Sequence, residues 1–160
     1  MAQLITATEV KTTAFLQGNI DTALIKDSYI EVVQEEHILP ALGKDLYEAI
    51  VAGSLNAANT TLLETYIKPA LAFFVAVDIV LHLSIRTANK GLMINSSETS
   101  NAASREERKD ITQRYREQGT TMLDKMVRFI EHSDNNQNYP LYNNGSSTVV
   151  TTKLPGGIIL

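Results

Sequence analysis

The residues best suited to acid–base chemistry lie on the most apolar stretch of the chain. Asp78 and His82 are four residues apart there, and Arg86 follows at the same spacing. On a helix these side chains share one face, where a carboxylate and an imidazole can exchange a proton or supply half of a metal site. The structural alternative is that Asp78 neutralises His82 or Arg86, because a charge buried in a bundle needs a partner. We favour this alternative, since no third ligand lies at helical spacing and no Glu-x-x-His motif is present.

Other reactive residue types are few. The chain has no cysteine, which excludes disulfides, thiolate metal sites, iron–sulfur clusters and cysteine nucleophiles. His37 and His132 are far apart, and the neighbours Glu35 and Glu36 face differently on a helix, so a metal site is not favoured. Neither a phosphate-binding loop nor a Gly-x-Ser-x-Gly nucleophile elbow occurs. We therefore expect no enzyme, no cofactor and no bound metal.

One basic cluster lies between residues 105 and 116, and acidic residues are interleaved with it. This pattern is typical of a solvated helix face with salt bridges. Tyr115 is the one aromatic residue in the cluster, whereas surfaces that bind single strands stack several aromatic rings on the bases. We therefore expect an exposed helix face here and no sequence-specific nucleic-acid site.

The chain length and the spacing of apolar residues predict one helical domain. With 160 residues, 44% apolar and 20% charged, the chain can bury a single core. Helices are expected over residues 6–16, 21–39, 44–51, from 60 onward, 70–85 and 104–132. Pro40 should end or kink the second helix, and Pro69 should either bend the helix from residue 60 or lie in the first turn of the next. The predicted architecture is an all-α bundle of about five helices, with a long C-terminal helix and an irregular connector loop over residues 87–103.

The helix expected over residues 21–39 is apolar over roughly 200°, a wider arc than a surface helix needs. Such an arc indicates burial on two sides, either in the centre of the bundle or at a contact between subunits. The residues of a candidate subunit interface are Ile25, Tyr29 and Val32 on this helix, with Arg105 and Arg108 at the start of the last one.

Charge is divided unevenly along a chain whose net charge is −4. Residues 1–67 contain three basic and nine acidic residues, whereas residues 68–133 contain ten and eight. This is not the balance of a nucleic-acid-binding protein. The two halves could attract each other between neighbouring copies, although surface charge also serves solubility alone.

Residues 134–160 differ from the domain formed by residues 1–133. They are rich in Asn, Ser, Thr and Gly, include a β-branched run over residues 148–152, and end in three apolar residues. An extended arm of this kind suits strand addition to a partner, with its apolar tip in a pocket. The alternative is a disordered, solubilising tail. The residues expected to dock are Val149, Val150, Leu154, Ile158, Ile159 and Leu160.

Several segments occur in an order that resembles one protein family. They are Leu4–Thr6, Ile38–Tyr47, Tyr66–Ala72, Gly91–Glu98 and Ala103–Arg105. The chain is similar to the helical head–tail connector (neck or adaptor-ring) proteins of tailed bacteriophages, in the branch from Bacteroidetes phages that includes crAss-like phages. The resemblance covers about residues 4–142, and Ile-Leu-Pro-Ala-Leu-Gly followed by Asp-Leu-Tyr is its most specific part.

The resemblance implies a structural protein of the virion neck, made in the cytoplasm of the bacterial host. Such proteins form a ring, typically of twelve copies, below the portal and join the capsid to the tail. The implied partners are further copies of the chain, the portal protein and downstream neck or tail proteins. Double-stranded DNA would pass non-specifically through the lumen, and no membrane is involved. The C-terminal arm would grip the portal or a neighbouring subunit.

Two alternatives stay open. The first is a tail-terminator or tail-completion protein, which would act at the other end of the neck. The second is a small helical enzyme or metal-binding protein that uses Asp78 and His82.

Overall fold

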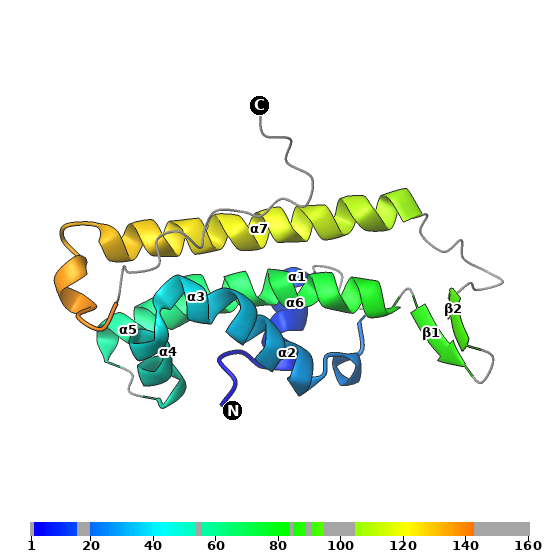
Figure 1. Cartoon of the computed structure of the whole chain (residues 1–160), viewed down its shortest axis with the longest axis horizontal. Helices are drawn as coiled ribbons and strands as arrows, with labels where there is room; N and C mark the ends of the chain where they lie inside the picture. The colour runs from blue at the N-terminus through cyan, green and yellow to red at the C-terminus, as the bar shows by residue number, and fades with distance from the viewer. Residues whose placement is uncertain are drawn as a thin grey trace.

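The computed structural model describes residues 2–15, 20–53, 56–83, 85–88, 91–94 and 105–142, and it confirms the all-α bundle (Figure 1). Two long helices each consist of two α-helical pieces joined by a π-helical segment. Counted in this way, the described residues form five helices: α1 (Ala7–Ala14), α2–α3 (Asp27–Val33 and Leu39–Leu42, joined by Gln34–Ile38), α4 (Lys44–Val51), α5–α6 (Ala57–Leu62 and Lys68–Leu83, joined by Leu63–Ile67) and α7 (Arg105–Glu131).

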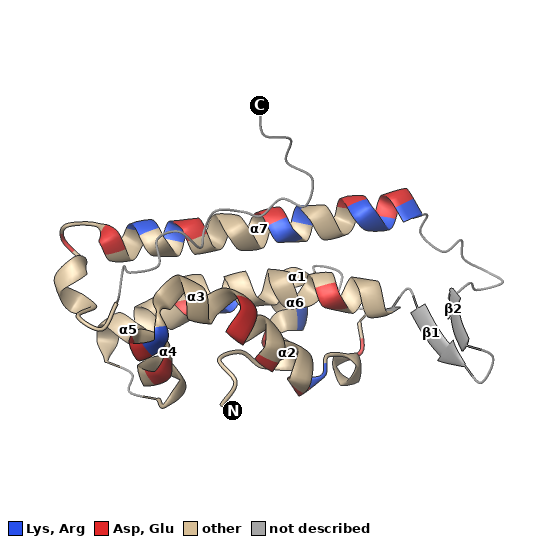
Figure 2. Cartoon of the chain, viewed as in Figure 1, with Lys and Arg blue, Asp and Glu red and all other residues tan. Residues whose placement is uncertain are grey.

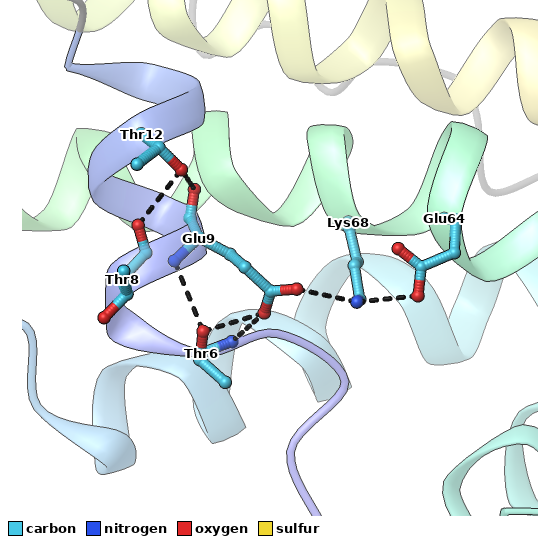
Figure 3. A network of polar contacts seen from close by, with 6 residues as sticks. All are labelled: Thr6, Thr8, Glu9, Thr12, Glu64 and Lys68. Carbon is cyan, nitrogen blue, oxygen red and sulfur yellow. Dashed lines mark hydrogen bonds and ion pairs between the residues drawn. The ribbon is translucent and has the colours of Figure 1, made fainter.

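Helix α1 begins at the predicted cap and is fixed to α6 by an ion-pair network (Figure 3). Thr6 and Glu9 form a capping box, in which the Glu9 N–H donates to Thr6 Oγ1 and the Thr6 N–H donates to Glu9 Oε2. Lys68 Nζ lies 2.7 Å from both Glu9 Oε1 and Glu64 Oε1. Burial opposes the ionisation of Glu9, but the hydrogen bonds from Lys68 and Thr6 outweigh it and lower the pKa of this carboxyl. The charged network therefore holds the first helix in place.

Helix α2–α3 differs from the prediction at both ends. Asp21 caps only a 3-10 turn over Thr22–Leu24, and the helix begins at Asp27. It then continues through Pro40 to Leu42, where proline was expected to end or kink it. The π-helical segment explains the difference: the Leu39 N–H donates to the Gln34 carbonyl, five residues back, so the widened turn just before Pro40 accommodates its ring.

A π-helical segment also precedes the proline in α5–α6, where it ends two residues before Pro69. There the Lys68 N–H donates to the Leu63 carbonyl. Residues 34–42 and 63–71 share Glu, Ile, Pro, Ala and Leu at equivalent positions. A short local repeat therefore encodes two proline-containing helices that continue through the proline.

The region after α6 contains a hairpin where an irregular connector was expected. Helix α6 ends at Leu83, and β1 (Ile85–Ala88) pairs antiparallel with β2 (Gly91–Ile94). The prediction that the helix includes Ile85 is wrong, because Ile85 pairs with Ile94 in the hairpin.

Helix α6 is the centre of the bundle, between α7 on one side and α1 and α2 on the other (Figure 1). Its buried residues include Leu71, Val75 and Ile79. By length and composition alone, Ala57–His82 could cross a membrane, whereas the predicted apolar stretch of 16 residues could not. Half of its most apolar window is buried in the bundle.

The packed domain continues beyond residue 133. Tyr139 lies in the core, and its hydroxyl donates to the Ala58 carbonyl at 2.9 Å. Residues 134–142 therefore pack against the bundle and are not part of a free arm. The predicted docking residues, Val149, Val150, Leu154, Ile158, Ile159 and Leu160, lie outside the described residues.

Candidate partner-binding surface

Asp78 and His82 lie on one side of α6, where α2 and its π-helical segment pass over it. The His82 ring is stacked on Tyr29, with ring centroids 4.6 Å apart and planes 7° from parallel. Burial raises the pKa of Asp78, and the nearby Glu36 raises it further, while His82 lowers it. The pair therefore belongs to a wider group of charges and aromatic rings.

His37, Phe74 and Gly119 bring three helices together beside this group. The His37 ring is stacked on Phe74 with centroids 3.9 Å apart. On the other side of the Phe74 ring lies Gly119 of α7, where an added Cβ would be 2.8 Å from the ring. Burial lowers the pKa of His37, so this imidazole is held in its neutral form as part of the packing. Among the residues that the structure describes, no three acidic or histidine side chains are placed to bind a metal.

A groove follows the seam between α6 and α7. Two open hollows of about 510 and 290 Å³ share Lys125. The apolar side chains that line them are Tyr66, Phe73, Met122 and Phe129. Tyr66 and Phe129 stack on each other at 4.9 Å. We call this surface the α6–α7 groove.

Basic side chains border the α6–α7 groove. Arg114, Lys125 and Arg128 are exposed, and none of them forms an ion pair with another described residue. The two acidic lining residues already have partners: Glu117 accepts a hydrogen bond from Gln113, and Asp134 lies 3.6 Å from His132. Three cations against these two carboxylates leave the border with a net positive charge.

A second exposed surface lies on α2–α3. Val32 has 58% of its surface exposed, which is high for a large apolar residue, and Glu35 and Glu36 follow one helical turn later. Figure 2 shows acidic residues on this helix, which has no Lys or Arg between Asp27 and Leu42, whereas α4 and α7 carry basic and acidic residues together. We call Val32, Glu35 and Glu36 the acidic ridge.

The residues predicted for a subunit interface differ in how exposed they are. Val32 and Arg105 are exposed, and Tyr29 and Arg108 are half-buried. Ile25 has only 3% of its surface exposed and packs in the core of its own chain, so it is not available to a partner. The groove was missed from the sequence, because its apolar residues have the same helical spacing as core residues.

Comparison with known proteins places the chain in a family. The model of a family of unknown function (DUF6712) matches residues 38–152, more than two thirds of the chain. The chain belongs to this family. No curated protein and no solved structure matches it. The DUF6712 match includes both walls of the α6–α7 groove and begins just after the acidic ridge.

Proposed function

We propose that this DUF6712 protein is a structural subunit of a phage neck, forming a ring below the portal that joins the capsid to the tail. The observation that carries the proposal is the segment Ile38–Tyr47, the most specific part of the resemblance to head–tail connectors. Ile38, Leu42 and Leu46 are buried in the core of the domain. The resemblance therefore rests on residues that determine the fold.

The same segment forms the corner between α3 and α4. Gly43 has a φ of 78°, a left-handed conformation that favours glycine, and it is the residue between the two helices. A change in this corner would turn α4 relative to α2–α3. The motif thus specifies a rigid subunit shape, which a closed ring requires of every copy.

The chemistry of the surface also supports a structural role. Two exposed surfaces of opposite charge, the acidic ridge and the border of the α6–α7 groove, are suited to contacts between proteins. His37, whose pKa is lowered by burial, is stacked on Phe74 in the packing between helices.

The proposal is tested by the mass of the purified protein, alone and mixed with the portal protein of the same phage. Light scattering coupled to size-exclusion chromatography should give a ring in at least one condition, with twelve copies expected from the resemblance. Electron microscopy of that fraction should show a ring with a central opening. A strict monomer in both conditions would contradict the proposal. Assembly onto tail tubes instead of portals would favour a tail-terminator role.

A further inference from the structure

We propose that the acidic ridge of one copy inserts into the α6–α7 groove of the next copy, and that this contact builds the ring. The inference rests on the proposed function and identifies the two surfaces that carry it. Val32 would lie against the apolar floor of the groove, while Glu35 and Glu36 would meet its basic border.

The two surfaces have complementary chemistry. Val32 is a single exposed apolar side chain with two carboxylates one turn away on the same helix. The groove offers the reverse: a floor that includes Phe73 and Met122, bordered by cations. Burying Val32 there would remove apolar surface from water on both sides of the contact.

The charges on both surfaces form no ion pair with another residue that the structure describes. Glu35 and Glu36 form no ion pair with another described residue, and the same holds for Lys125 and Arg128. Opposite charges that form no ion pair among the described residues of one copy can pair between copies. Such pairing orients the contact and excludes the reverse docking, in which like charges would meet.

One copy cannot bring its own ridge and groove together. Gly119 of α7 packs on the Phe74 ring, which is stacked on His37 of the ridge helix. Arg116, three residues earlier on α7, acts electrostatically on His37 and Asp78, so its side of α7 faces the helix that carries the ridge. Lys125 comes nine residues later, and at 100° per residue it lies about 180° around α7 from Arg116. The ridge and the groove are therefore on opposite sides of the molecule. A contact between two different surfaces is head-to-tail, and repeating it gives a closed ring or a filament.

A charge exchange tests the contact. Glu35→Lys and Lys125→Glu should each weaken self-association by about tenfold or more, since each brings like charges together across the interface. Mixing the two variants should restore assembly. The ridge of the Glu35→Lys variant would meet the groove of the Lys125→Glu variant, and the second variant's natural ridge would meet the first variant's natural groove. Sedimentation velocity over a range of protein concentrations measures the association, and rising salt should weaken it.

Matched variants separate this contact from general effects of charge. Glu48→Lys makes the same charge change on α4, outside the ridge, and should assemble like the natural protein. Val32→Asp removes the apolar contact and should assemble poorly even when mixed with Lys125→Glu. Circular dichroism checks that every variant keeps its helices.

The outcomes distinguish the ridge–groove contact from the ring itself. If the natural protein forms rings but either single variant assembles normally, or the mixture is not restored, the ridge–groove contact is wrong and the ring proposal stands. If the natural protein is a strict monomer with and without the portal, both are overturned.

Discussion

At the scale of single residues, the charge of Asp78 is disfavoured by its surroundings in the folded protein. It lies half-buried on the core helix, and burial and the Glu36 carboxylate both raise its pKa. A raised pKa in the folded state means that the protonated form is favoured there. Asp78 therefore contributes stability below the pKa of the unfolded chain, and this contribution is lost as the pH rises through the raised folded value.

We therefore expect Asp78→Asn to be more stable than the natural protein at neutral pH. The gain should be up to ~1 kcal/mol, the range of partly exposed charge interactions, because the amide keeps the shape of the side chain without its charge. Urea denaturation at several pH values measures this gain in the free energy of unfolding. The gain should shrink as the pH falls toward the pKa of an ordinary aspartate, because the Asp78 carboxyl is then protonated in the folded and the unfolded chain alike. Asp110→Asn, at an exposed position on α7, is the control and should change little. A variant less stable than the natural protein at neutral pH would show that ionised Asp78 makes a net favourable interaction.

At the scale of the elements, the irregular turns in the helices determine which residues are buried as much as the apolar faces do. The predicted interface on residues 21–39 assumed one regular helix, so that Ile25 shared an arc with Tyr29 and Val32. Residues 22–24 form a 3-10 turn instead, and the π-helical segment at residues 34–38 shifts the phase of the helical turn after it. Ile25 consequently points into the core. Caps such as Thr6 and the inward faces of α4 were predictable, because they depend on local sequence alone.

The packing of α6 against α7 can be tested at Gly119. Alanine at an exposed helix position is normally more stabilising than glycine by about 1 kcal/mol. Here we expect the opposite for Gly119→Ala, a loss of about 1–3 kcal/mol, because the new methyl would meet the Phe74 ring. The ring cannot retreat easily, since His37 lies against its other face. Thermal and urea unfolding measure the effect.

A double variant provides the control for this clash. Phe74→Leu alone should destabilise the bundle by loss of packing, but Gly119→Ala added to it should cost little or improve stability. This non-additivity identifies the Phe74–Gly119 contact as the cause. If Gly119→Ala unfolds at the same or a higher temperature than the natural protein, the close approach of the helices is not required.

At the scale of the whole molecule, folding and assembly use different parts of the chain. The described core begins at Leu4 and ends at Tyr139, and it is continuous across all five helices. The proposed assembly surfaces lie on the outside, and sequence alone could not find the groove. Tyr66, Phe73, Met122 and Phe129 have core spacing, and only the packing of α6 against α7 leaves them half-exposed at a seam.

This separation makes truncation of the C-terminal arm informative. Removing residues 146–160 takes away none of the described core, so the shortened chain should keep its helical signal by circular dichroism and its unfolding temperature. We expect it to lose binding to the portal or to the neighbouring subunit, measured by co-sedimentation with portal rings and by mass. A full-length variant with Ile158, Ile159 and Leu160 changed to serine should show the same loss if the apolar tip is the part that docks.

Loss of portal binding with self-assembly intact assigns the arm to the portal, because the ridge–groove contact lies entirely within residues 32–135. Loss of self-assembly assigns the arm to a neighbouring subunit, and normal incorporation of the truncated chain would contradict the docking role.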